Sequence, residues 1–137
     1  MSEKNKAILE EANIAVAEGD YEKFLSFCSE DTEWTFIGDQ ILKGKEAVRR
    51  WMAAEYIEPP VNVVAHLVAE GEFVTAIGNI MTKDQGGREN RFAYCDVWRF
   101  QDGKMVELKA FVIAADNDHK SDGAIFNTSF GEKSENF

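Results

Sequence analysis

Apolar residues recur at helical intervals in three segments of the first half of the chain. In the first segment Ile8, Ala12, Ala15 and Val16 have the i, i+4, i+7, i+8 spacing of an amphipathic helix, which Gly19 ends. The same kind of spacing returns twice before the proline pair that closes off the third segment. The three predicted helices cover residues 8–18, 21–28 and 45–56.

The rest of the pattern is the alternation of apolar and polar residues that is typical of strands. The stretch TEWTFIG alternates Trp34 and Phe36 with polar neighbours, and a short strand at Ile41-Leu42 follows it. Four longer segments separated by turns predict an antiparallel meander: VNVVAHLVA, FVTAIGNIMT, FAYCDVWRF and KMVELKAFVIAA. Helices followed by a strongly twisted sheet predict an α+β fold, a cone-shaped α+β barrel in which three N-terminal helices pack on a strongly curved, mainly antiparallel sheet.

The composition changes after residue 115, where the chain becomes polar. The last segment, DNDHKSDGAIFNTSFGEKSENF, has only four large apolar residues and cannot build a core of its own. A chain of 137 residues with 45% apolar composition is long enough for one compact domain. We therefore predict one domain, residues 1–115, followed by a polar C-terminal tail, residues 116–137.

Charge and composition exclude several classes of partner. The 15 Lys and Arg residues and 25 Asp and Glu residues give a net charge of −10, which repels nucleic acid and anionic membrane surfaces. No apolar run reaches the roughly 18 residues that span a bilayer, and the N-terminus has no apolar signal core, so a cytoplasmic protein is expected. Cys28 and Cys95 lack metal-binding spacing and are interpreted as buried free thiols; no metal and no cofactor is predicted.

Asp96 lies in the middle of a strand face that is otherwise aromatic. In the segment FAYCDVWRF every second residue lies on the same face of the strand as Asp96. These residues are Phe92, Tyr94, Trp98 and Phe100. An unpaired carboxylate in such surroundings costs several kcal/mol unless it takes up a proton, so a raised pKa is predicted. The alternative is a structural aspartate, hydrogen-bonded at a strand end or exposed at a cavity mouth. A three-residue loop at 101–103 predicts the hairpin register, with Asp96 opposite Leu108, Tyr94 opposite Ala110 and Trp98 opposite Val106.

A cone that is open at its wide end leaves a pocket between the helices and the sheet. His66 lies in a strand with apolar residues on both faces. The alternation therefore does not decide whether its side chain faces this pocket. Asn79 either supplies a polar contact in the pocket or marks a bulge stabilised by Gly78. Besides Asp96, the residues predicted to line the pocket are Trp34, Phe36, Trp51, Tyr56, Asn79, Tyr94, Trp98, Leu108 and Ala110.

Three stretches of the chain resemble a known superfamily: AEGDYEKFLSFCSEDTEW, GKEAVRRWM and DVWRFQDGKMVELKAF. They are similar to the nuclear transport factor two-like proteins, and among these to the SnoaL-like and ketosteroid-isomerase-like proteins. In the isomerases an aspartate base, a helix tyrosine and a protonated aspartate act together. The resemblance places the protonated aspartate at Asp96, but the base falls on or beside Phe36 and the tyrosine near Ala12, so ketosteroid isomerase activity is not supported. SnoaL-like cyclases rely on an acidic residue and often a histidine, which here implies Asp96 and, as the weaker candidate, His66.

These features favour a SnoaL-like protein that binds a small, mostly apolar ligand in the cone cavity. One alternative is a cofactor-independent isomerase, cyclase or dehydratase-type enzyme that uses Asp96 as an acid or a base. Another is a non-catalytic dimerisation or accessory module. A homodimer is predicted through the convex face of the sheet, because that parity carries apolar residues, namely Ala93, Cys95, Val97, Phe111 and Ile113.

Overall fold

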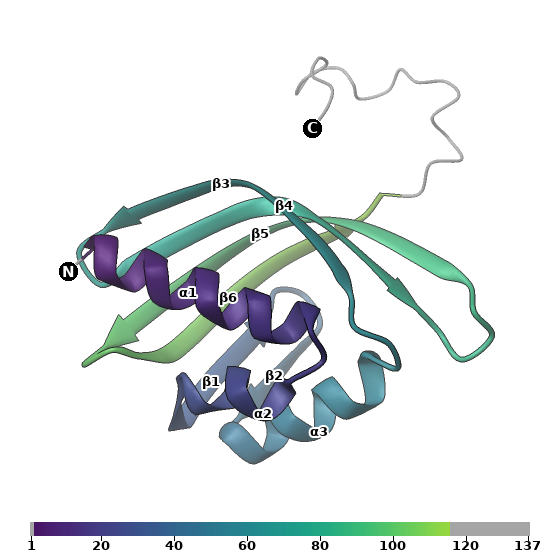
Figure 1. The fold of residues 1–137 in the computed structure, drawn as a ribbon, viewed down its shortest axis with the longest axis horizontal. Helices are drawn as coiled ribbons and strands as arrows, with labels where there is room; N and C mark the ends of the chain where they lie inside the picture. Colours follow the sequence, from purple (N-terminus) through teal and green to yellow (C-terminus); the bar gives the residue numbers. More distant parts are fainter. Residues whose placement is uncertain (1, 116–137) are drawn as a thin grey trace.

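A computed structural model describes residues 2–115, and the predicted tail at residues 116–137 lies outside the described residues. Three helices lie on the concave side of a curved six-stranded sheet (Figure 1). The helices are α1 (Ser2–Ala17), α2 (Tyr21–Ser26) and α3 (Lys45–Glu55). The strands are β1 (Cys28–Phe36), β2 (Gln40–Lys43), β3 (Val61–Glu70), β4 (Phe73–Lys83), β5 (Glu89–Gln101) and β6 (Lys104–Ala114).

The three predicted helices are all present, and the local sequence explains how the first two are joined. Gly19 has a positive φ of 81°, a conformation that glycine adopts without steric cost, and it ends the first helix. Asp20 then caps α2, because its side chain accepts a hydrogen bond of 3.1 Å from the backbone N–H of Lys23. The apolar side chains that the helices bury in the core are Leu9, Ala12, Ala15, Phe24, Leu25, Val48 and Met52.

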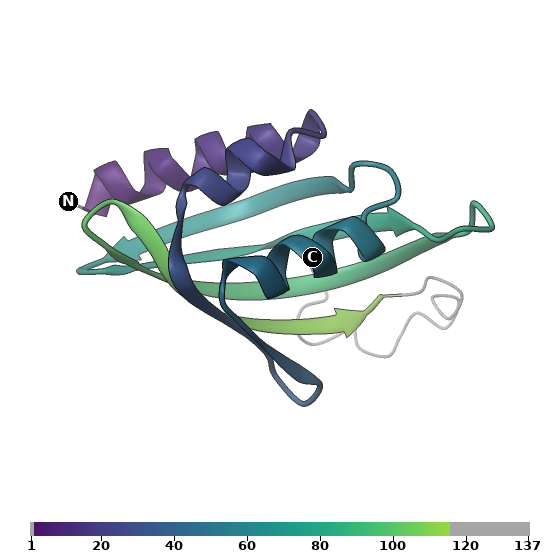
Figure 2. The ribbon, with the colours of Figure 1, turned by 90° about the horizontal axis from the view of Figure 1, so that it is seen from below.

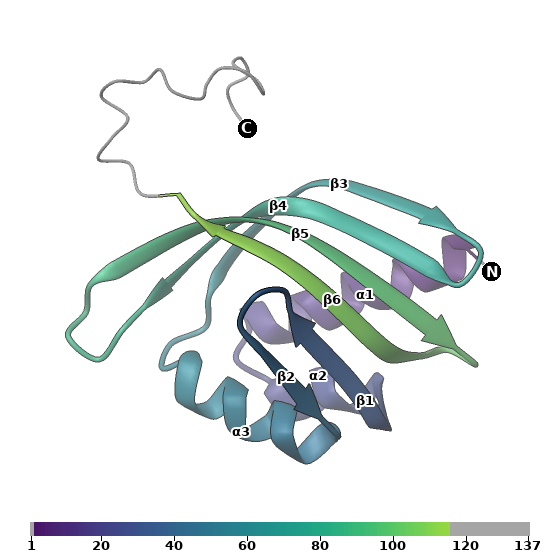
Figure 3. The same ribbon diagram turned by 180° about the vertical axis from the view of Figure 1, so that it is seen from behind.

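The sheet has the strand order β2-β1-β6-β5-β4-β3 and stays open between its two edges. Strands β3 to β6 form the predicted antiparallel meander. The first strand pairs antiparallel with β2 and parallel with β6, which places the β1-β2 hairpin beneath the arch of the meander (Figure 3). The predicted α+β cone, with helices on a strongly curved and mainly antiparallel sheet, is confirmed, although the sheet does not close into a barrel.

The hairpin between β5 and β6 has a shorter turn than the predicted three-residue loop. Asp102 and Gly103 form a two-residue turn in which both residues have positive φ, 53° and 78°, as the type I′ hairpin turn requires. An irregularity between Arg99 and Phe100 then shifts the pairing. The predicted register was therefore wrong by two residues, and the observed partners are Asp96 with Ala110, Trp98 with Leu108 and Tyr94 with Val112.

A bulge in β3 changes which of its side chains face the helices. The pairing with β4 shifts between Val64 and His66, so that Ala65 is an extra residue opposite the neighbouring strand. Gly78 lies at this point, where an added Cβ would come within 2.2 Å of the Val63 carbonyl oxygen. Because of the bulge, the alternation of β3 is reversed at residue 65. If it had continued unchanged, the residues that now face outward after the bulge would face the helices.

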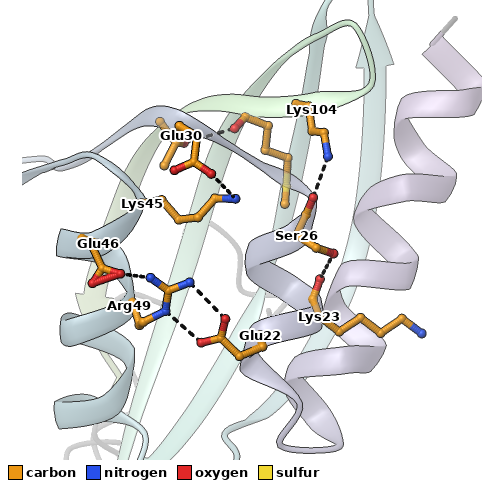
Figure 4. A network of polar contacts seen from close by, with 10 residues as sticks. Glu22, Lys23, Ser26, Glu30, Lys45, Glu46, Arg49 and Lys104 are labelled. Carbon is orange, nitrogen blue, oxygen red and sulfur yellow. Dashed lines mark hydrogen bonds and ion pairs between the residues drawn. The ribbon is translucent and has the colours of Figure 1, made fainter.

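The two ends of the helical layer cover different parts of the sheet. Seen from below, α1 lies towards β3 and α3 lies towards the β1-β2 hairpin (Figure 2). Arg49 of α3 links to α2 at the surface, because its guanidinium donates two hydrogen bonds to Glu22, of 2.8 and 3.0 Å, and another to Glu46 on its own helix (Figure 4). Lys104 donates a hydrogen bond of 2.7 Å to the Ser26 carbonyl oxygen, which ties the β5-β6 turn to the end of α2.

Candidate functional site

A cavity of about 670 Å³ lies between the helices and the concave face of the sheet. Its inner end is formed by buried side chains, among them Phe24 and Trp98, which contact each other edge to face. Its mouth lies between the C-terminal ends of α1 and α3 and the β1-β2 turn. Exposed residues such as Ile14 and Ile37 border the mouth. Eight of the nine residues predicted to line the pocket do so: Trp34, Phe36, Trp51, Tyr56, Tyr94, Trp98, Leu108 and Ala110.

Aromatic side chains form one continuous wall of the cavity. Trp34 lies edge-on to Trp98 at a ring distance of 5.5 Å, and Trp51 lies 6.0 Å from Trp34. Trp51 stacks on Phe36 at 5.0 Å and contacts Tyr56 edge to face at 5.3 Å. Edge-to-face and offset contacts at these distances are favourable. These contacts stabilise the arrangement of the rings, and all three tryptophans of the chain belong to the wall.

Asp96 projects from β5 into this apolar cavity. It is half-buried, and its carboxyl group has no hydrogen-bond partner and no ion-pair partner within residues 2–115. Burial raises the pKa of Asp96 from its ordinary value of 3.8 to about 7, because the cavity stabilises the charged form less well than water does. Near neutral pH the carboxyl group is therefore present in both the protonated and the ionised form.

Two tyrosines supply hydroxyl groups near Asp96. Tyr94, on the same face of β5, donates a hydrogen bond of 2.6 Å to the side-chain oxygen of Asn62 on β3. Burial, and then the neighbouring Asp96 carboxylate, raises the pKa of Tyr94 to about 12. Tyr56 follows α3, and its pKa is also raised, first by burial and then by Asp96. Both phenols remain protonated at neutral pH. The Tyr94 proton is already donated to Asn62, so the Tyr56 hydroxyl is the one available as a hydrogen-bond donor to a ligand.

Two predicted site residues point away from the cavity. His66 is exposed, because the β3 bulge at Ala65 turns it to the outer face of the sheet. Asn79 is also exposed on the outer face, since the cavity-facing residues of β4 are the alternate ones, including Ile80. Asn62 was not predicted as a site residue, and it supplies the amide that was expected from Asn79. The signal for it was a polar residue interrupting the apolar start of VNVVAHLVA.

Sequence comparison assigns the family. A family model described as the SnoaL-like domain matches residues 9–108, which is most of the chain. The chain belongs to the SnoaL-like family. A search of curated proteins gave no match. In the part of this SnoaL-like protein that the structure describes, no helix has the length and apolar composition needed to cross a membrane.

Several solved structures have the same fold. The epoxide hydrolase/cyclase-like enzyme SalBIII, studied for pyran ring formation in the polyether salinomycin, has a TM-score of 0.75 at 20% identity, over 80% of this chain and 91% of its own. A putative SnoaL-like polyketide cyclase from Jannaschia sp. CCS1 has a TM-score of 0.72 at 15% identity, over 81% and 86%. TerC, co-crystallised with polyporic acid, has a TM-score of 0.68 at 15% identity, over 79% and 90%. At these identities the likeness shows the shared fold.

The arrangement in this SnoaL-like protein allows one kind of polar chemistry inside an apolar cavity. Asp96 can donate a hydrogen bond when protonated and accept a proton when ionised, and Tyr56 can donate a second hydrogen bond. Phe36 lines the cavity where the resemblance places the isomerase base, and Ala12 is buried in the core where it places the tyrosine. Neither side chain can transfer a proton, so the ketosteroid isomerase triad is not assembled.

Proposed function

We propose that this SnoaL-like protein binds a small, mostly apolar ligand that carries an oxygen atom, and that protonated Asp96 donates a hydrogen bond to that oxygen. The observation that supports this most strongly is an unpaired carboxyl group with a pKa of about 7 in a cavity with aromatic walls. A pocket with apolar walls and few polar groups fixes a ligand by shape and orients it by those groups. Tyr56, which follows α3 and also lines the cavity, offers the second donor.

A second function, catalysis by proton transfer, is favoured by the same pKa. A group that titrates near neutrality is an effective general acid and an effective general base, because both forms are populated at the working pH. The reaction classes that need one such group and an apolar cavity are isomerisation, cyclisation and dehydration. In this reading Asp96 touches the reacting atoms, and Tyr56 stabilises negative charge that develops on the ligand oxygen.

A neutral ketone tests binding and proton transfer in the same sample. The probe is 4-tert-butylcyclohexanone, and its binding is followed by the fluorescence of the three cavity tryptophans. With a pKa of about 7, the protonated fraction of Asp96 falls about tenfold between pH 6 and pH 8, and affinity should fall with it. Proton transfer is followed by exchange of the α-protons of the ketone in D2O, measured by proton NMR.

Two variants separate the two roles of Asp96. Asp96→Asn keeps a hydrogen-bond donor, so it should bind the ketone at both pH values but lose the proton exchange. Asp96→Leu keeps the branched shape of the side chain, with somewhat larger terminal groups, and lacks the donor, so it should bind about tenfold more weakly than the wild type at pH 6. Wild-type affinity that is independent of pH and equal to that of Asp96→Leu would contradict the binding proposal. Exchange that persists in Asp96→Asn would contradict the catalytic one.

We also propose that the outer face of the sheet joins two copies of the chain. Ile113 is 70% exposed and Phe111 is 45% exposed on this face, and they pair with Ala93 and Cys95 on β5. Exposed apolar side chains grouped in this way favour burial against another surface, and a face that repeats on each copy can pair about a two-fold axis. Sedimentation analysis should give a dimer at tens of micromolar, and a monomer at that concentration would contradict the proposal.

A further inference from the structure

The charged residues around the cavity all have the same sign. Among the described residues that line it there is no Lys, Arg or His, whereas Asp39, Glu55 and Asp96 are acidic. The chain as a whole carries a net charge of −10, and a cleft lined by one sign of charge concentrates counter-ions of the other sign. A carboxylate or phosphate ligand is therefore disfavoured at this site.

The aromatic wall continues to the mouth, where three of its rings retain exposed surface. Phe36, Trp51 and Tyr56 are half-buried, and Trp51 lies between the other two, stacked on one and edge-on to the other. Aromatic ring faces carry negative partial charge and attract organic cations, tryptophan most strongly. Phe36 covers one face of Trp51, so the ring surface left for a positive group is the part of Trp51 and Tyr56 that remains exposed.

Two acidic residues line the cavity next to the segments that carry these rings. Asp39 lies in the β1-β2 turn, where its backbone N–H donates a hydrogen bond of 2.9 Å to the Phe36 carbonyl oxygen, and Glu55 directly precedes Tyr56 at the end of α3. Neither carboxylate takes part in an ion pair with a described Lys or Arg. Over residues 2–115 no group of three His, Cys, Asp or Glu side chains could hold a metal ion. The aromatic rings and carboxylates together match an organic cation better than a metal.

We infer that the mouth of the cavity binds a protonated amine or quaternary ammonium group, held between Trp51, Tyr56 and the carboxylates of Glu55 and Asp39. The inference rests on the proposed function, because it assumes that the apolar part of the same ligand fills the cavity behind the mouth. The ligand is then a cationic molecule with an apolar body, whose oxygen atom reaches Asp96 and whose nitrogen stays at the rim.

Three adamantane derivatives with the same apolar cage test this assignment. The probes are 1-adamantanamine, 1-adamantanol and 1-adamantanecarboxylate, which are cationic, neutral and anionic at pH 7. Binding is followed by the fluorescence of the cavity tryptophans. The amine should bind about tenfold more tightly than the alcohol, and the carboxylate more weakly than either. The advantage of the amine over the alcohol should shrink as salt is added, because the flanking carboxylates are exposed.

Variants of the rim locate the effect. Glu55→Gln removes one exposed charge and should lower the affinity for the amine about threefold while changing that for the alcohol less than twofold. Glu70→Gln, a matched removal of one exposed charge in β3, outside the lining residues, should change neither. Trp51→Leu should lower the affinity for the amine more than that for the alcohol. If that variant fails to fold, Glu55→Gln and the salt dependence still decide the question.

The outcomes separate this inference from the proposed function. Equal or tighter binding of the alcohol than of the amine would overturn the cation site, while the proposed function would stand. Equal losses in Glu55→Gln and Glu70→Gln would also overturn it, because the preference would then come from net charge alone. Failure of all three adamantanes and of the neutral ketone to bind would overturn both.

Discussion

Replacement of Asp96 by asparagine should stabilise the fold at neutral and alkaline pH and have little effect in acid. Asparagine has nearly the same shape as protonated aspartic acid but cannot ionise in the apolar cavity. In the unfolded chain Asp96 has a pKa of 3.8, whereas burial raises it to about 7 in the folded state. Between these values the folded state binds the proton more tightly than the unfolded one. The stability contributed by protonated Asp96 is therefore fully present below pH 4 and is lost as the pH rises to 7.

The size of the effect follows from the separation of the two pKa values. They differ by about three units, and each unit corresponds to about 1.4 kcal/mol, so ionisation of Asp96 costs the folded state about 4 kcal/mol above pH 7. This is a large part of the 5–15 kcal/mol that is typical for the free energy of unfolding of a domain, about a quarter or more. Glu22 and Glu107 have pKa values lowered by hydrogen bonds from Arg49 and Arg99, and they act in the opposite direction. Both are unchanged in the variant, so their contributions cancel in the difference.

Urea unfolding at several pH values measures this difference. The free energy of unfolding of Asp96→Asn should be close to that of the wild type at pH 4 and exceed it by about 4 kcal/mol at pH 8. Asp31→Asn, an exposed position on β1, is the matched control and should show no pH-dependent difference. A difference between Asp96→Asn and the wild type that stays constant within about 1 kcal/mol from pH 4 to pH 8 would refute the reasoning. Asp96 would then be solvated or paired, and the pocket-acid interpretation would have to be abandoned.

Three further substitutions test other parts of the structure. Gly78→Ala should destabilise the fold by about 1–3 kcal/mol in urea unfolding and displace the Tyr94 hydroxyl, which would lie 3.0 Å from the added Cβ. Gly86→Ala is the control, because the nearest atom to its added Cβ would be 3.5 Å away. Thr32→Val should cost about 1 kcal/mol, because the fully buried hydroxyl that it removes donates a hydrogen bond of 3.1 Å to a β6 carbonyl oxygen; thermal unfolding measures the loss. Ile113→Lys should convert the proposed dimer to a monomer in sedimentation, and a dimer that persists would show that another surface joins the copies.

Much of the fold could be predicted because the contrast between helical and alternating periods is strong in this chain. The face of Asp96 was predicted correctly even though its partner across the hairpin was not. An error of two residues in register leaves every side chain on the same face, whereas an error of one would have reversed it. The predicted three-residue loop is wrong, because Asp102-Gly103 is the pair that a two-residue hairpin turn prefers, and Gln101 pairs with Lys104.

The directions of His66 and Asn79 could not be predicted from alternation alone. The segment VNVVAHLVA has apolar residues on both parities, so a bulge within it leaves no break in the pattern. Gly78 was a partial signal, since a glycine inside a strand often marks a bulge or a close approach of backbone. Here the bulge lies in the partner strand, and the glycine makes room for it.

The polar rim of the cavity depends on contacts between distant parts of the chain. Asp39 and Glu55 belong to a turn and a helix end, where acidic residues are ordinary surface features. They line the same cavity because the β1-β2 hairpin packs against α3, with Phe36 and Trp34 both in contact with Trp51. No local pattern carries this information, and the parallel pairing of β1 with β6 is equally non-local.

That parallel pairing determines the order in which the molecule can be completed during synthesis. Thr32 on β1 and the Met105 carbonyl oxygen that it contacts are separated by 73 residues, so β1 emerges from the ribosome long before its partner strand. Until β6 follows, the hairpin of β1 and β2 has no sheet to join, and the cavity lacks the wall that contains Leu108 and Ala110. Contacts of this separation make folding slow, because a long loop must close before they form. A ligand therefore cannot assist the early steps of folding: its binding site and the completed sheet come into existence together.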